Sequence, residues 1–328
     1  MSEPQFQQMA FSPEVLARIA PDISLQRHLA VDLRPSLRGL LEFRPLNISA
    51  GGLNESGQNS LVGLAIAKNG ETRVVVGINL GLIQENAVDE LLSGSVSKEV
   101  ASQYTSVYPV VEISRGRLGA PTDEEMIISQ KLHESIYHAK LVKRSSLTVN
   151  VGNMIDGDFE SLPQEDQRWS FVLYAHIKVF SRSGPLFDLC HAALLAALEN
   201  TKLPRAFIDE NSTDIKIPIR GRKFGHIRQQ KNLILDTSHA LPLPLEKRNT
   251  SLTFGVVVKD SDGSAVLLAD LEGEAEELSA TLKIAVVASD DNMLSQVDIV
   301  GGGAQITKEL LIQAISIARE RHVLGNNH

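Results

Sequence analysis

Residues 169–200 combine a strand pattern with a helix pattern that has no polar face, and this pairing constrains the fold more than any other feature. Apolar residues recur at every second position over 169–180, which predicts a strand with one buried face and one mixed face. From Leu186 the chain is apolar on every side, interrupted only by Asp188 and His191. A helix of this kind lies buried in the centre of a sizeable fold. The chain is therefore expected to build its sheets around one central helix.

The polar turn over 181–185 links this strand to the central helix and raises the first functional question. The turn brings backbone N–H groups to a helix N-terminus, an arrangement that can cradle an anion. Inside the helix, Asp188 and His191 are the polar side chains. We interpret Asp188 as a paired and satisfied core carboxylate rather than a catalytic one, because buried polar groups are normally hydrogen-bonded.

Charge, hydropathy and cysteine content exclude several classes of protein. The 328-residue chain has a net charge of −8, which argues against a free-standing nucleic-acid binder but not against a local basic groove. It has no apolar run of about 18 residues and no secretory signal pattern, so neither a transmembrane helix nor secretion is expected. Cys190 is the single cysteine, which excludes an internal disulfide and a zinc site built from cysteines.

Strand patterns come first and helix patterns follow in each half of the chain, which predicts an α+β fold. In the first half an Asn-Gly pair at 69–70 marks a hairpin, and Thr122 with Glu125 forms a capping box ahead of a helix. The predicted organisation has three parts: an N-terminal arm over 1–40, a first domain over 41–205, and a second domain over 206–328 that begins with a connector.

Several stretches together resemble the RNase PH family. They are RPSLR at 34–38, the hairpin LAIAKNGETRVVVGI, the strand, loop and capped helix EISRGRLGAPTDEEMIISQKLHESI, and the C-terminal GGGAQIT. No one of these motifs is specific, but their order and spacing together are. The resemblance implies an RNase PH-like fold of two mixed β-sheet units, each packed with helices.

The branch that fits most closely is that of the eukaryotic exosome ring subunits, which the stretches FSPEVLARIAP, SRSGPLFDLC and LPRAFIDE resemble. This resemblance implies a six-membered ring of RNase PH-like subunits, with OB-fold cap proteins above it and a separate hydrolytic nuclease below. Single-stranded RNA would thread through the central channel. The expected location is the nucleus, nucleolus and cytoplasm, and no membrane association is expected.

Active members of the family need a phosphate cradle with a cation, a carboxylic acid and RNA-holding arginines. At the corresponding positions this chain has Leu186 in place of the cation and Thr281 in place of the acid, while Ser36 and Leu37 interrupt the arginine arm. Threonine cannot act as a general acid near neutral pH. We therefore predict a non-catalytic ring subunit that uses no cofactor. The rival hypotheses are an active phosphate-dependent exoribonuclease and a stand-alone scaffold without an RNA role.

Two basic segments are candidates for RNA contact. By the resemblance, Arg115 and Arg117 fall at RNA-binding positions, in a loop between a strand and a helix. The densest basic run lies further along the chain, and it either contacts RNA phosphates or a cap protein or forms a solvated hairpin. Its candidate residues are Arg220, Arg222, Lys223 and Arg228.

An acidic cluster over 270–277 is the last candidate site. It holds five carboxylates, which form either a divalent-metal site or a solvated turn at a sheet edge. We favour the solvated turn, because charge runs are usually solvated, and we predict no metal site. The carboxylates are Asp270, Glu272, Glu274, Glu276 and Glu277.

Overall fold

The structure, a computed structural model, describes most of the chain. The described residues are 11–51, 61–84, 107–116, 119–149, 152–155, 158–161, 169–208, 233–290, 293–303 and 306–325.

The first unit is a mixed sheet whose strand order is β1-β2-β3-β8-β4, with the short β5 paired to β8. All its pairs are antiparallel except β4 with β8. The alternation predicted over 169–180 is confirmed, since Leu173, Ala175 and Ile177 are buried and the intervening Tyr174 and His176 are exposed. The strands are β1 (Leu46–Ala50), β2 (Leu61–Asn69), β3 (Thr72–Gln84), β4 (Val107–Ile113), β5 (Thr148–Val149) and β8 (Trp169–Ser181).

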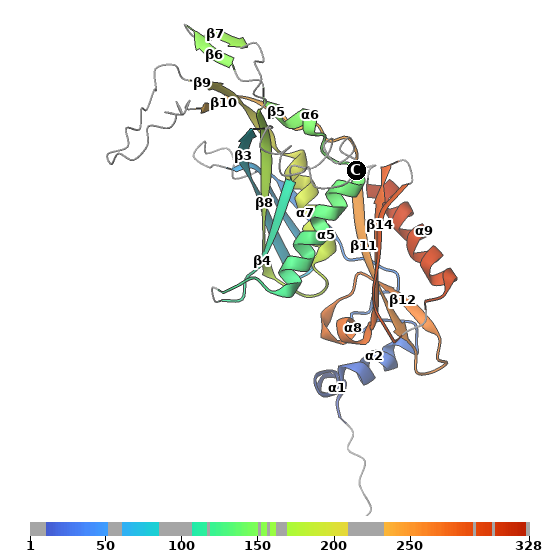
Figure 1. Cartoon of the computed structure of the whole chain (residues 1–328). Coiled ribbons are helices and arrows are strands. Elements are labelled where there is room, and N and C mark those ends of the chain that lie inside the picture. Colours follow the sequence, from blue (N-terminus) through green and yellow to red (C-terminus); the bar gives the residue numbers. More distant parts are fainter. Residues whose placement is uncertain are drawn as a thin grey trace, which may run out of the picture.

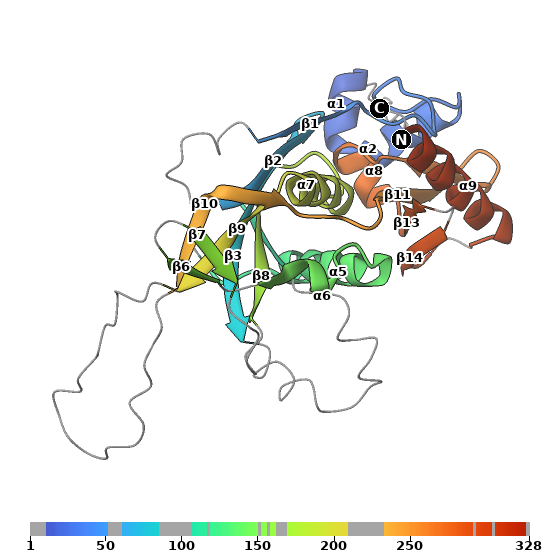
Figure 2. The same cartoon turned by 90° about the horizontal axis from the view of Figure 1, so that it is seen from above.

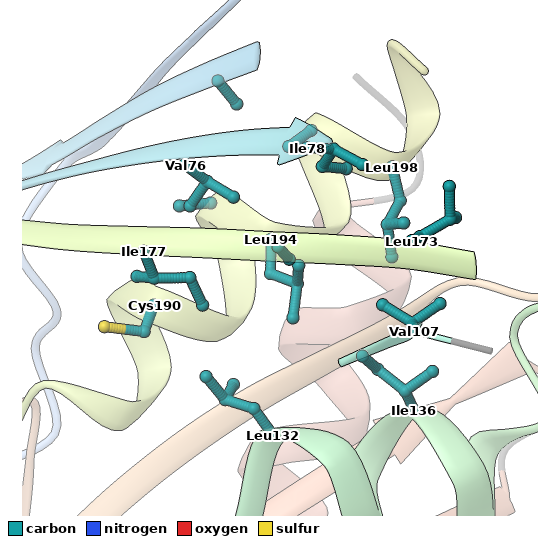
Figure 3. Close-up of a cluster of buried hydrophobic side chains, with 14 of the residues drawn as sticks. Val76, Ile78, Val107, Leu132, Ile136, Leu173, Ile177, Cys190, Leu194 and Leu198 are labelled. Carbon is teal, nitrogen blue, oxygen red and sulfur yellow. The ribbon is translucent and has the colours of Figure 1, made fainter. Parts of the chain in front are cut away.

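The apolar helix is central, as its sequence predicts. It is α7 (Phe187–Glu199), which packs on β2 and β3 of the first sheet and on β11 of the second unit. Figure 2 shows it end-on between the two sheets. In Figure 3 the side chains of Cys190, Leu194 and Leu198 lie with Val76 and Ile78 in this core.

Helix α5 (Asp123–Ala139) lies beside α7 on the same side of the first sheet, where it covers β4 (Figure 2). The predicted capping box is present, because Thr122 and Glu125 exchange their side-chain and backbone hydrogen bonds. A short helix, α6 (Arg144–Leu147), follows it.

The second unit is an antiparallel sheet of order β12-β11-β13-β14. One face packs on α7, and α9 packs on β11, β12 and β13, so that the fold alternates sheet, helix, sheet and helix (Figures 1 and 2). The elements are β11 (Asn249–Val258), β12 (Ala265–Ala269), α8 (Gly273–Ser279), β13 (Leu282–Ser289), β14 (Met293–Gly301) and α9 (Lys308–Gly325).

The sequence predicts a strand near 232–236, and the structure places it in a third, small sheet that the patterns did not indicate as a unit. Its order is β10-β9-β6-β7, and it lies at one end of the first sheet (Figure 1). Its strands are β6 (Gly152–Ile155), β7 (Asp158–Ser161), β9 (Lys202–Ile208) and β10 (Leu233–Pro242). The β6–β7 hairpin is rich in polar residues and glycine, so its strands lack the apolar alternation that reveals a strand.

The N-terminal arm packs on the second unit rather than on the first. It contains α1 (Pro13–Ile19) and α2 (Pro21–Leu29), and α2 contacts α8. Leu25 and Leu29 are fully buried in a cluster with Val257 and Leu268. Figure 1 shows the blue arm helices beside α8, at the end of the molecule away from the third sheet. The chain therefore crosses from the second unit to the first sheet before β1.

No helix in the described part of the chain meets the length and apolarity needed to span a membrane.

Candidate functional site

The turn between β8 and α7 is the candidate anion cradle, and both backbone groups of Ser183 in this turn are already used within the chain. The Ser183 N–H donates to the Thr72 hydroxyl at 2.9 Å, and the Ser183 carbonyl accepts from the Gly273 N–H at 2.8 Å. Gly184 is required here, because a Cβ at this position would lie 2.4 Å from the Leu271 carbonyl oxygen. The turn is thus packed tightly against the segment that precedes α8.

Leu186, which the resemblance puts at the cation position, points into the hydrophobic core with 2% of its surface exposed. Pro185 before it has no N–H to donate. A cation from outside the turn does reach it, because Arg44 Nη1 donates to the Ser183 hydroxyl at 3.0 Å. Sequence reasoning missed Arg44 because it lies just outside the arginine arm over 34–38.

Arg44 is held by Asp270, a residue with positive φ (48°) just after β12. Asp270 Oδ2 accepts from the backbone N–H and the Nε of Arg44, each at 2.9 Å, and Oδ1 accepts from Nη2 at 2.7 Å. Burial raises the pKa of Asp270, but the Arg44 hydrogen bonds and charge outweigh it and hold the pKa below the ordinary aspartate value. Arg38 adds a second cation, 2.9 Å from Glu272 and 3.4 Å from Asp270.

Arg34 makes the deepest of these contacts. Its side chain is fully buried against Glu276 of α8, with Nε 2.9 Å from Oε1 and a second, shorter contact from Nη2 to Oε2. Its remaining N–H groups donate to carbonyl oxygens, including those of Ala269 at 2.6 Å and Asp270 at 2.9 Å. Every face of the guanidinium is therefore satisfied within the chain.

These contacts correct the interpretation of the acidic cluster as a solvated turn, which is wrong for two of its members. Glu276 is 1% exposed, and Asp270 is largely buried under Arg44. The cluster consists of residues in α8 and in the segment just before it. Arginines that lie more than 200 positions earlier in the chain neutralise its carboxylates. Among the described residues no group of three or more metal-binding side chains is assembled.

The two positions that interrupt the arginine arm form a tight turn at the surface. Leu37 has a positive φ of 62° and is 75% exposed, and its N–H donates to the Arg34 carbonyl at 2.8 Å. The Ser36 hydroxyl accepts from Arg38 Nε at 3.1 Å. Thr281, which the resemblance puts at the position of the acid, is exposed just before β13, and its carbonyl accepts from the Gly302 N–H at 3.2 Å.

Arg115 lies just beyond β4, where it is tied to the capping box. Its Nη2 is 2.8 Å from Glu125 Oε2, while Glu125 also accepts from the N–H groups of Ile113 at 2.7 Å and Thr122 at 2.5 Å. Burial alone would raise the pKa of Glu125. The hydrogen bonds and the charge of Arg115 have the larger effect, and together they lower the pKa to about 2. About a third of Arg115 remains exposed, so the ion pair leaves part of it accessible to a ligand. Arg117 lies outside the described residues.

The dense basic run also lies outside the described residues, so its two interpretations stay open. Its candidates are Arg220, Arg222, Lys223 and Arg228.

The polar groups of the central helix are core groups, as predicted. Asp188 accepts hydrogen bonds from Ser251 and Thr253 of β11. Burial raises the pKa of Asp188 above its ordinary value, although these hydrogen bonds lower it in part. His191 lies 3.0 Å from the Ser135 hydroxyl, and burial lowers the pKa of His191 to about 4. A neutral imidazole and a fully bonded carboxylate join α7 to α5 and β11.

Comparison with known families decides the fold family. Residues 42–204 match the RNase PH family, described as the 3′ exoribonuclease family, domain 1. This chain carries an RNase PH domain. The match runs from the approach to β1 into β9, so the RNase PH domain includes α5, α7 and the turn between β8 and α7.

Similarity to individual proteins extends beyond the RNase PH domain to almost the whole chain. The exosome complex component rrp43 of Schizosaccharomyces pombe is 26% identical over 321 residues, 96% of this chain and 97% of the relative. The exosome complex component Rrp42 of Pyrobaculum aerophilum is 25% identical over 303 residues, covering 90% of this chain and 89% of the relative.

Two solved structures show the same RNase PH-like fold. An Archaeoglobus fulgidus exosome with RNA bound to the active site aligns at a TM-score of 0.62 and 18% identity, covering 96% of this chain and all of that chain. An archaeal exosome core aligns at 0.59 and 17%, covering 94% and 96%. The predicted α+β class and RNase PH-like fold are confirmed, except that the second of the two helix-packed sheet units is antiparallel and not mixed.

The contact between Thr72 and the turn before α7 is one that the sequence could have revealed. Thr72 is the threonine of the hairpin motif GET at 70–72, directly opposite Asn69 in the β2–β3 register. Its hydroxyl accepts from Ser183 and lies 3.0 Å from the Ser183 hydroxyl. A threonine at a fixed place in a hairpin that resembles a family motif is a signal for such a contact.

Proposed function

We propose that this chain is a non-catalytic RNase PH-like subunit of an exosome ring, with a structural and RNA-channel role in 3′ to 5′ RNA processing and degradation. Ribosomal RNA maturation and messenger RNA decay are the processes it would serve. The observation that carries this proposal is the similarity to an exosome component over 96% of this chain and 97% of the relative. A similarity confined to the RNase PH domain would not carry it.

The geometry of the turn supports the absence of catalysis. A phosphate ion needs free backbone donors and a cation aimed at it. Here the Ser183 N–H is taken by Thr72, Pro185 has none, and Leu186 is buried in the core. The nearby cations are Arg44, which Asp270 already neutralises, and Arg182, which is paired with Glu124 and Glu277.

The other partners follow from membership of a ring. Five further RNase PH-like subunits would complete it, OB-fold proteins would cap it, and a hydrolytic nuclease would degrade RNA that leaves the channel. Local basic groups such as Arg115 on an acidic chain suit a channel wall, where several subunits contribute charge together. We place the complex in the nucleus, nucleolus and cytoplasm.

A two-part experiment tests the proposal. The chain is co-expressed with candidate ring subunits, and complex size is measured by light scattering. The purified chain is separately incubated with single-stranded RNA and inorganic phosphate, beside an active phosphorolytic enzyme as positive control. We expect incorporation into a ring and no nucleoside diphosphates. Release of nucleoside diphosphates by this chain would identify it as an active exoribonuclease, and a monomer that joins no complex would identify it as a stand-alone scaffold.

A further inference from the structure

The β2–β3 hairpin carries a pair of like charges that the fold does not need. Lys68 on β2 and Arg73 on β3 are direct cross-strand partners, and both side chains are exposed. Like charges in this position destabilise a sheet. Within the described part of the chain neither side chain has an ion-pair partner. A ligand with negative charge would relieve their repulsion.

Beside this pair an aromatic ring lies on the exposed face of β8, next to an irregularity in the sheet. Arg73 faces Ser181 on β8, while Val74 faces Val179, so Phe180 is an extra residue without a partner on β3. Bulges of this kind occur often next to functional sites. The ring of Phe180 is 54% exposed and contributes little to the core.

The cations and the ring line one hollow on the surface. Its volume is about 410 Å³, within the range of ligand sites. Glu71 also lines it, so the side chains of the hollow carry one net positive charge. The next cation along β8, Lys178, is 3.3 Å from Glu112 and is therefore neutralised. The remaining lining residues are Gly70 and Ser181.

We propose that this hollow binds one nucleotide of single-stranded RNA. Lys68 and Arg73 contact the phosphates on either side of a base that stacks on Phe180. Aromatic rings that stack bases beside cations that hold the backbone are the usual means of binding single strands without sequence preference. An acidic peptide would use the cations but has no planar base for the exposed ring. The inference rests on the proposed function, because ring membership is what brings RNA to this chain.

Charge removal gives the first test, in the reconstituted ring with a labelled single-stranded RNA across a salt series. The double variant Lys68→Gln with Arg73→Gln should reduce the slope of log affinity against log salt by about 1.4, the value for two lost phosphate contacts on a single strand. Its melting temperature should stay equal or rise, since a repulsive pair is removed. Lys202→Gln with Lys308→Gln, two exposed lysines elsewhere, is the matched control. Equal slopes in both double variants would overturn the proposal.

The aromatic contact is tested separately. Phe180→Leu keeps an apolar side chain but removes the stacking surface, so RNA affinity should fall at least about five-fold. Unchanged affinity would mean that the ring of Phe180 is not a base platform.

Crosslinking distinguishes RNA from a protein neighbour. Phe180 is replaced by the photocrosslinker p-benzoylphenylalanine, and both the assembled ring and the free full chain are irradiated with labelled RNA. An RNA adduct in either sample supports the inference, whereas adducts with protein alone, or none, overturn it. Ring assembly is scored independently by light scattering. An assembled ring without an RNA adduct therefore defeats this inference only, while a chain that enters no ring defeats the proposed function.

Discussion

Asp188 at the start of α7 binds Thr253 of β11 through both carboxylate oxygens, with the Thr253 N–H at 2.6 Å and its hydroxyl at 3.0 Å. Ser251 donates a third hydrogen bond at 2.6 Å. One half-buried carboxylate therefore fastens the central helix to the second sheet unit.

Asp188→Ala should destabilise the protein by about 3 kcal/mol, because it leaves a buried N–H and two hydroxyls without an acceptor. Asp188→Asn keeps one acceptor oxygen and should lose less. The free energy of unfolding is measured by urea denaturation, with the exposed Asp260→Ala as control. A loss no larger than that of the control would contradict the assigned role.

The buried pair of Arg34 and Glu276 should behave as one unit in a double-mutant cycle. Arg34→Met alone leaves a buried carboxylate unpaired and should cost about 3–5 kcal/mol. The double variant with Glu276→Gln should cost clearly less than the sum of the two single changes, since neither charge is stranded. The exposed pair of Arg182 and Glu124 is the matched control, with an expected coupling below about 1 kcal/mol. Similar coupling energies in the two cycles would show that burial does not strengthen the first pair.

His191 should make stability depend on pH between its ordinary pKa of 6.5 and its folded pKa of about 4. The folded state holds the imidazole neutral, so the unfolded state binds the additional proton in this range. Stability is therefore complete above pH 6.5 and decreases as the pH falls, by about 2 kcal/mol at pH 5. His191→Gln should remove this component, which is measured as the difference between urea midpoints at pH 7.5 and pH 5. An unchanged difference in the variant would assign the pH dependence to other groups.

Cys190 should be inert in the folded protein. Burial, reinforced by the nearby Asp188 charge, raises the pKa of its thiol to about 12, and its side chain is fully buried. Iodoacetamide should label it only after unfolding in urea, because the thiolate is the reactive form. Ser261→Cys, at an exposed position, supplies a thiol that should react within the same time in the native protein. Rapid native labelling that disappears in Cys190→Ala would show that α7 opens locally.

Arg115 should contribute to RNA retention by the assembled ring through the part of its side chain that Glu125 leaves exposed. Arg115→Gln is preferred to a charge reversal, which would place a second carboxylate beside the buried Glu125. One lost phosphate contact should lower the salt slope by about 0.7 for single-stranded RNA. Filter binding measures it, and an identical slope would show that this loop faces protein or solvent.

Local patterns predicted the parts of the fold that local physics determines. The alternation along β8 and the apolar surface of α7 are visible in the sequence because each residue's burial follows from its position in its own element. The capping box of Thr122 and Glu125 is equally local. The β6–β7 hairpin was missed because its residues do not alternate.

The candidate site was harder to predict because its contacts join distant segments. Nothing near Glu276 in the sequence indicates that Arg34 will neutralise it, so its run of charges was assigned to solvent. Arg44 and Ser183 meet for the same reason only in the folded chain. The positions of Leu186 and Thr281 could be interpreted only through the family resemblance.

The docking of the arm on the second unit also has a consequence for the order of events during synthesis. Arg34 leaves the ribosome 242 residues before Glu276, which at 5–20 residues per second is a delay of roughly ten to fifty seconds. Throughout that interval the arm carries Leu25, Leu29 and an unneutralised arginine with no surface to receive them. The arm of a nascent chain therefore stays exposed until the second unit has been translated. It is the segment on which a chaperone bound to the growing chain would have the longest time to act.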